Sequence, residues 1–404
     1  MDALREDLRA PTRWPVLDGV RGLAVVSVVL YHAIRLLVLG EGSSTADGYS
    51  ALWWPVMTGR LALDAFFVLS GFLIVASWRA VRERHGSLWR AAADYGRRRG
   101  ARILPGYYLS LLILVPLVAP HLFRSPGDLA LLAGVQQYLR PGLPSEVNVV
   151  YWSLTTEVHF YVLAPLVAVA LKVLGARVTI AASLALAVWW QATTPGGLPQ
   201  SLVFGRVDQF VLGAALAPVV AAFDKGARPR LVRMLQPRAV GIALVVALIS
   251  LGVWQGAILA GTAKAHAYLL HPAVGLVMAA ILLRLMTLGR PTFLEHPGLR
   301  LAGIVSYGVY LFHYPILEYG FRWIGIGARD PGPAYLMIAA TITLTLVSFI
   351  VGGASYALVE RPFFRRKVEA PVPQGPRGDR QPTRTLTAWP MSTATSTTSS
   401  ARSA

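Results

Sequence analysis

The sequence predicts an all-α protein that crosses a membrane roughly ten times, and three observations support this fold class. Of the 404 residues, 55% are hydrophobic and only 14% are charged, whereas a soluble chain carries about a quarter charged residues. Apolar stretches recur along the chain, and their length is close to the roughly 20 residues that a membrane-spanning helix needs. The basic residues lie in short clusters between them. Because backbone groups in hydrocarbon must satisfy their own hydrogen bonds, we expect a polytopic helical bundle.

The predicted spans follow one another with mostly short connections. The first one follows Arg5, Arg9 and Arg13 and so has the charge pattern of a signal peptide. It has no small-residue cleavage site and further spans follow it, so we expect it to be retained as the first helix. The spans are expected near residues 17–39, 60–78, 103–123, 155–174, 178–194, 203–222, 239–259, 268–288, 303–324 and 334–358.

Positive charge is distributed unequally between alternate connections. The even-numbered connections hold sixteen Lys and Arg residues and the odd-numbered ones hold four. Cytoplasmic loops carry the excess of Lys and Arg, so we predict that the even connections and both termini are cytoplasmic. This topology accounts for much of the net charge of +18, and no nucleic-acid partner is expected.

The composition changes after Lys367, where Pro, Gly, Ser, Thr and Arg become common and large aliphatic residues almost disappear. We therefore predict one integral-membrane domain over residues 1–367 and a disordered cytoplasmic tail over 368–404. No second soluble domain is expected. The chain has no cysteine, which excludes disulfides, thiolate nucleophiles and Cys-ligated metals, and no metal site is predicted.

Ionisable side chains inside a span are candidates for function, because a charge in hydrocarbon is unfavourable by several kcal/mol. Arg21 and His32 lie eleven positions apart in the first span, which is three turns with about 20° left over, so they share a helix face. His32 then lies about 16 Å deeper than Arg21, near the middle of the membrane. The pair predicts a route for an anionic cytoplasmic cosubstrate. Taken singly, His32 could pack against a neighbouring helix and Arg21 could anchor the first span at the membrane surface.

Two further polar clusters have a structural alternative. Glu157 and Tyr161 stand four residues apart at the outer start of the fourth span and so share a helix face. A carboxylate there could orient an imidazole, bind a sugar hydroxyl or contact interfacial water. Arg206 and Asp208 precede the apolar part of the sixth span, and an ion pair between them is the simplest interpretation.

A polar stripe marks the ninth span. Ser306, Tyr310 and His313 fall at positions i, i+4 and i+7 of an otherwise apolar helix. Such a stripe is expected to face protein or water rather than lipid.

A basic cluster stands in the predicted connection between the second and third spans. Arginine makes bidentate contacts with phosphate, so the cluster could hold the phosphates of a nucleotide at the membrane surface. The positive-inside rule and anionic lipid binding explain the same charges. Its members are Arg97, Arg98, Arg99 and Arg102.

Seven segments in chain order resemble the integral-membrane acyltransferase family 3, which includes sugar O-acetyltransferases of bacterial surface glycans and acyltransferases of macrolide antibiotics. The resemblance covers most of the chain. In the fourth-span segment many relatives carry two adjacent acids, and here the second position is Val158, so only Glu157 is carried over. The segments are residues 17–24 with 31–33, 64–74, 98–107, 152–161, 206–213, 306–315 and 360–363.

The resemblance implies transfer of an acyl group, with acetyl favoured, from cytoplasmic acyl-CoA to a hydroxyl of a sugar, a surface glycan or a macrolide. It implies a multi-pass protein of the bacterial plasma membrane with no permanently bound cofactor. His32 would act as general base, because an imidazole titrates near neutrality. Arg21 and Glu157 complete the predicted catalytic group. Direct attack by the acceptor is the simpler route, and an acyl-histidine or acyl-serine through Ser70 or Ser306 is the alternative.

The remaining candidate residues fall into two groups. The predicted CoA-binding residues are Arg98, Arg99, Arg102 and Tyr107. The predicted substrate cavity is lined by Asp64, Ser70, Arg206, Asp208, Ser306, Tyr310 and His313. The alternative function is a transporter or flippase for a glycolipid, in which buried charges line an alternating-access path; a sensory or scaffolding membrane protein is a third class.

Overall fold

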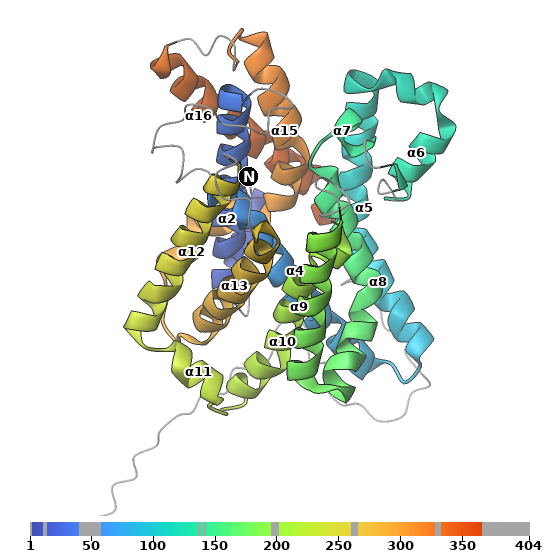
Figure 1. Ribbon diagram of the computed structural model, residues 1–404. Coiled ribbons are helices and arrows are strands. Elements are labelled where there is room, and N and C mark those ends of the chain that lie inside the picture. Colours follow the sequence, from blue (N-terminus) through green and yellow to red (C-terminus); the bar gives the residue numbers. More distant parts are fainter. Residues whose placement is uncertain are drawn as a thin grey trace, which may run out of the picture.

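The computed structural model describes residues 2–10, 14–39, 58–135, 139–140, 143–194, 202–259, 266–327 and 333–365. Within these ranges every regular element is a helix, so the predicted all-α helical bundle is confirmed (Figure 1). The predicted tail over 368–404 lies outside the described residues.

Each predicted span overlaps a long helix. Eight helices in the described part are long and apolar enough to cross a membrane, and α9 and α15 are not among them. The number of spans and the side on which the termini lie stay predictions. The long helices are α2 (Pro15–Leu39), α4 (Ala62–Arg84), α5 (Leu88–Val118), α8 (Tyr151–Val173), α9 (Gly175–Thr193), α10 (Val207–Asp224), α12 (Arg238–Leu259), α13 (Leu270–Thr287), α15 (Ser306–Trp323) and α16 (Ala334–Ser355).

Short helices occupy the ends of the bundle and its connections. Three of them extend a long helix directly, since η1 leads into α4, η6 leads into α13 and η8 continues α16. They are α1 (Asp2–Arg9), η1 (Thr58–Leu61), η2 (Pro120–Arg124), α6 (Pro126–Ala133), α7 (Leu143–Val147), η5 (Val203–Gly205), α11 (Arg230–Leu235), η6 (Ala267–Leu269), η7 (Phe293–Glu295), α14 (Pro297–Ile304), η8 (Tyr356–Glu360) and α17 (Arg361–Arg365).

The basic cluster lies on a helix, which corrects the prediction that residues 79–102 form a loop. Helix α4 continues to Arg84 and α5 begins at Leu88, so only three residues connect them. Arg and Ala are strong helix formers, and they extend both helices beyond the apolar stretches from which the loop boundaries were predicted. The arginines therefore have fixed positions around a helix axis.

Glycine allows the helices that build the site to approach one another at backbone distance. A Cβ atom at Gly71 of α4 would lie 2.0 Å from the carbonyl oxygen of Phe210, and one at Gly213 of α10 would lie 1.9 Å from that of Val68. Helix association within a membrane favours such small residues, because they let backbones pack closely. The contact fixes α10 against α4, and Asp64 of α4 and Gln209 of α10 belong to a buried polar cluster.

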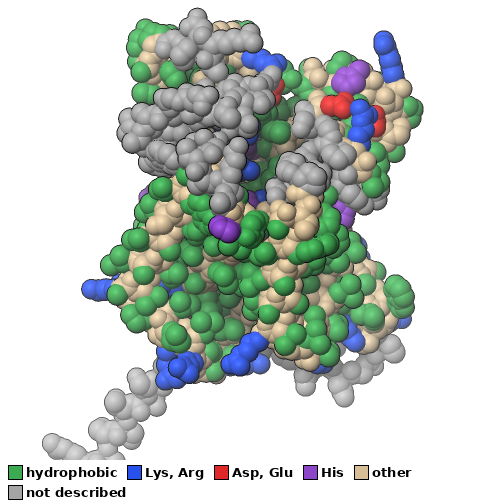
Figure 2. All heavy atoms as spheres, in the orientation of Figure 1, with side chains coloured by type: hydrophobic (Ala, Val, Ile, Leu, Met, Phe, Trp, Pro, Cys, Tyr) green, Lys and Arg blue, Asp and Glu red, His purple; other side chains and the backbone are tan. Residues whose placement is uncertain are grey.

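The face of the molecule seen in Figure 2 has an apolar middle and a group of basic side chains at its lower end. Figure 2 shows hydrophobic side chains over the middle of the visible face, where α12 and α13 lie, and Lys and Arg side chains at the lower end near α11. On α12, Ile242 is 65% exposed and Ile249 is 55% exposed, as expected for a lipid-facing helix. The positive-inside rule predicts that the end near α11 is cytoplasmic.

Candidate functional site

Two cavities meet inside the bundle, and we name them after the predicted orientation of the chain. The outer cavity has a volume of about 570 Å³, and the inner cavity has a volume of about 240 Å³. Leu63 and Tyr310 line both cavities, so these side chains stand between them. A third cavity of about 200 Å³, the vestibule, shares Arg21, Arg102 and Tyr307 with the inner cavity. The three cavities form a series from the predicted cytoplasmic end outward.

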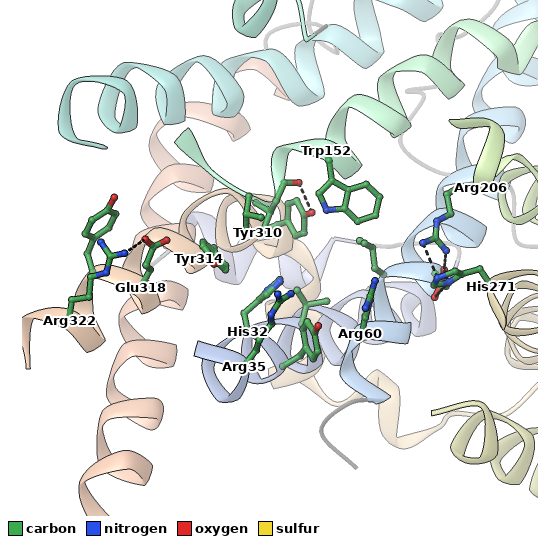
Figure 3. A pocket seen from close by; sticks show the side chains of 17 residues that line it. His32, Arg35, Arg60, Trp152, Arg206, His271, Tyr310, Tyr314, Glu318 and Arg322 are labelled. Carbon is green, nitrogen blue, oxygen red and sulfur yellow. Dashed lines mark hydrogen bonds and ion pairs between the residues drawn. The ribbon is translucent and has the colours of Figure 1, made fainter. Parts of the chain in front are cut away.

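His32 faces the outer cavity and is held by a histidine from another helix (Figure 3). Its Nδ1 lies 3.0 Å from Nε2 of His313, which is fully buried in α15. Nδ1 of His313 lies 2.8 Å from the carbonyl oxygen of Tyr310 and 3.1 Å from that of Val309. A carbonyl oxygen only accepts, so the Nδ1 of His313 carries the hydrogen, and its Nε2 accepts from His32 when the ring is neutral. In this arrangement the Nε2 of His32 is unprotonated, and its lone pair can accept a proton.

A buried polar cluster around Asp64 forms one wall of the outer cavity. Oδ1 of Asp64 accepts from Nη1 of Arg206 at 2.9 Å and from Nε2 of Gln209 at 2.7 Å. Nδ1 of His271 lies 3.1 Å from the same oxygen. Nε2 of His271 lies 3.1 Å from Nη2 of Arg206, and because a guanidinium only donates, this nitrogen accepts and Nδ1 donates to Asp64. The cluster joins α4, α10 and α13.

The predicted ion pair between Arg206 and Asp208 does not form. Arg206 pairs instead with Asp64, which is 142 positions away in the chain. The reason is geometric: residues two apart on a helix do not face each other. Both carboxylate oxygens of Asp208 are buried without a hydrogen-bond partner in the described part of the chain, and Asp208 lines none of the three cavities.

Glu157 lies in the inner cavity and is not a partner of His32. Its Oε1 accepts a hydrogen bond from the Ser70 hydroxyl at 3.0 Å and one from the Tyr161 hydroxyl at 2.7 Å. The second bond agrees with the shared helix face that the spacing of four residues predicts. Ser306 also lines this cavity, and its buried hydroxyl has no hydrogen-bond partner among the described residues.

Tyr310 is fixed at the boundary between the two cavities. Its hydroxyl donates to the carbonyl oxygen of Val150 at 2.9 Å and contacts the Ser153 hydroxyl at the start of α8. These bonds tie α15 to α8 where the cavities meet. Of the polar stripe on α15, Ser306 therefore faces the inner cavity, Tyr310 faces both cavities, and His313 supports His32 from within the protein.

The predicted CoA-binding residues separate into two pairs. Arg99 and Arg102 line the inner cavity, where Arg21 also lies. Arg99 donates to the carbonyl oxygen of Leu73 at 3.1 Å and lies over the rings of Tyr95 and Tyr161. The other pair lines none of the three cavities.

Each residue of this other pair has a partner elsewhere. Nε of Arg98 lies 3.1 Å from Oδ2 of Asp94. Tyr107 is buried and donates to the carbonyl oxygen of Leu132 at 2.6 Å. In place of Tyr107, the tyrosines that line the inner cavity together with Arg99 and Arg102 are Tyr161, Tyr307 and Tyr310.

Several residues of the outer cavity were missed by the sequence analysis. His271 stands inside a predicted span, so the rule for intramembrane ionisable groups could have found it. Arg35 is one helical turn after His32 on the same helix, and Arg60 stands at the predicted start of the second span. Gln209 does not line the cavity but donates to Asp64 in its wall; it is neutral, and no sequence signal marks it.

Comparison with known proteins assigns the family. Residues 14–353 match the family model Acyl_transf_3, which is described as an acyltransferase domain. The chain belongs to acyltransferase family 3. It is 27% identical to the peptidoglycan O-acetyltransferase OatA of Listeria monocytogenes over 86% of this chain and 55% of that protein. It is 27% identical to the acyltransferase MdmB of Streptomyces mycarofaciens over 87% of this chain and 92% of that protein.

A third relative of this family 3 chain is the putative peptidoglycan O-acetyltransferase YrhL of Bacillus subtilis. It is 25% identical over 86% of this chain and 54% of that protein. The chain thus spans about half the length of the two peptidoglycan relatives. No solved structure matches the chain. Membership of this family and the apolar helices together indicate a multi-pass membrane protein.

Proposed function

We propose that the chain is an O-acyltransferase of the bacterial plasma membrane that moves an acyl group from cytoplasmic acyl-CoA to a hydroxyl acceptor in the outer cavity. The observation that carries the proposal is that two cavities meet at Leu63 and Tyr310. The outer cavity holds the imidazole of His32 with its free lone pair, and the inner cavity holds three arginines. The acceptor is a sugar, a surface glycan or a macrolide. Relatives named as O-acetyltransferases make acetyl the favoured acyl group.

The inner cavity and the vestibule suit the donor. Arg21 and Arg102 line both of them, and Arg99 lines the inner cavity. CoA is a polyanion, and guanidinium groups bind phosphate bidentately. The pantetheine arm would then extend through the inner cavity and present the thioester at Tyr310. No protein-bound cofactor is needed, because the acyl group arrives activated on its carrier.

His32 acts as the general base in this scheme. Its Nε2 removes the proton from the acceptor hydroxyl as the oxygen attacks the thioester carbonyl, which forms the new C–O bond. The tetrahedral intermediate collapses, the C–S bond breaks, and the CoA thiolate leaves and takes up the proton. His313 holds the ring of His32 in the tautomer that has Nε2 unprotonated, which is the role of an orienting residue behind a catalytic histidine.

The proposal is tested with purified protein in phosphatidylcholine nanodiscs, labelled acetyl-CoA and an extract of envelope glycans. We expect acceptor-dependent release of CoA with the parent chain and loss of release with His32→Ala. His159→Ala is the matched control, because His159 is a half-buried histidine that lines none of the three cavities. Unchanged turnover in a folded His32→Ala protein would remove the general-base role, and substrate movement without CoA release would favour a transporter.

A further inference from the structure

Four arginines line the outer cavity, and two of them have no acid partner in the described part of the chain. Arg206 is paired with Asp64 at 2.9 Å, and Arg322 is paired with Glu318 at 3.2 Å. Asp64 and Glu318 are the acids among the lining residues. Among the described residues that line the outer cavity, Arg35 and Arg60 therefore leave an excess of two positive charges.

These two arginines lie beside the proposed general base. Arg35 follows His32 by three residues on α2, which places it about 4.5 Å further along the helix on a neighbouring face. Arg60 comes from η1, on another segment of the chain. Figure 3 shows Arg35, His32 and Arg60 on the same side of the pocket, facing Tyr310 and Trp152. A molecule whose hydroxyl reaches His32 must therefore lie next to two guanidinium groups.

We infer that the outer cavity binds an acceptor that carries an anionic group, a carboxylate or a phosphate, between Arg35 and Arg60; this inference rests on the proposed function. Two like charges in a cavity of low dielectric repel each other and favour an anion between them. The planar guanidinium group matches the oxygens of a carboxylate or phosphate. The anion is not a CoA phosphate, because Arg21, Arg99 and Arg102 offer those phosphates a site on the far side of Leu63 and Tyr310.

The binding experiment needs no acyl donor. The full chain in phosphatidylcholine nanodiscs is titrated by calorimetry with glucose, glucuronate and glucose 6-phosphate, which share a sugar ring and differ in charge. We expect at least one of the two acids to bind about tenfold or more tightly than glucose. The acid that binds tells whether the group is a carboxylate or a phosphate. Phosphatidylcholine has no net charge and is present at the same concentration in every titration, so the difference between the acids and glucose does not come from the lipid.

Variants assign the anion to the two arginines. Arg35→Gln and Arg60→Gln should each weaken binding of the acid by about tenfold, and Arg60→Lys should weaken it less, because it keeps the charge. Arg124→Gln is the control, since Arg124 is exposed on the same predicted side of the membrane and outside the cavity. Equal binding of the acids and glucose, or an equal loss in Arg124→Gln, would overturn the inference.

Transfer kinetics separate this role from stabilisation of the reacting oxygen. With the preferred acid as acceptor, Arg60→Gln should raise the acceptor KM and leave kcat within about twofold. A fall in kcat for neutral and acidic acceptors alike would instead assign Arg60 to the thioester oxyanion and overturn the inference. Absence of any transfer, with binding that still depends on Arg60, would contradict the proposed function and leave the anion site standing.

Discussion

The hydrogen bond between His32 and His313 makes the sharpest prediction about activity. His313→Leu removes the acceptor for Nδ1 of His32 and replaces the fully buried imidazole with an apolar side chain of similar size. An unpaired buried N–H group is unfavourable by about 1–3 kcal/mol, and about 1.4 kcal/mol of barrier changes a rate tenfold. Because the bond holds the tautomer of His32 that the proposed reaction uses, we expect kcat to fall by about ten- to a hundredfold.

His313→Gln is the matched rescue variant. Its side-chain carbonyl oxygen accepts from Nδ1 of His32, so a large part of the lost kcat should return. The assay is steady-state release of CoA with saturating acceptor, and the melting temperatures of both variants are measured beside the parent. The KM for acetyl-CoA should stay unchanged, because His313 lies away from the inner cavity. Full activity of His313→Leu, or equal losses in the two folded variants, would refute the tautomer argument.

Two further predictions concern packing and donor binding. Gly71→Ala places a Cβ atom 2.0 Å from a backbone oxygen of α10, so the yield of monodisperse protein and the melting temperature should both drop; Gly353→Ala, where nothing lies within 4 Å, should behave like the parent. Arg99→Gln and Arg102→Gln should each raise the KM for acetyl-CoA by about tenfold with little change in kcat, whereas Arg98→Gln should leave it unchanged. Equal effects of all three arginine variants would show that the inner cavity does not bind the donor phosphates.

Hydropathy predicts the helices well, because the thickness of a bilayer sets one length for every span. Helix ends are harder to predict, since a helix continues beyond the hydrocarbon wherever its residues favour helix, as α5 does between Leu88 and Arg102. The periodicity of one helix indicates which residues share a face. It does not indicate which other helix that face will contact, and contacts between helices decide most of the site.

Particular residues show this limit. The shared face of Glu157 and Tyr161 follows from a spacing of four residues, and the structure has the corresponding hydrogen bond. The bond from His32 to His313 joins residues 281 positions apart, and no local pattern contains it. Arg98 and Arg102 also share a helix face, yet Asp94 lies one turn before Arg98 and pairs with it. Of these two arginines, Arg102 alone lines the inner cavity.

The narrow partition made by Leu63 and Tyr310 has a consequence for the energised membrane. A continuous water-filled pore between the vestibule and the outer cavity would let ions leak and dissipate the membrane potential. The Tyr310 hydroxyl donates to the carbonyl oxygen of Val150, so its aromatic ring is held in place between the two cavities, beside the aliphatic side chain of Leu63. Under the proposed function only the thioester end of acyl-CoA passes between Leu63 and Tyr310, and the charged phosphates of CoA stay on the inner side. The acyl group can then be transferred from a donor on one side of the bilayer to an acceptor on the other while the bilayer remains impermeable to ions.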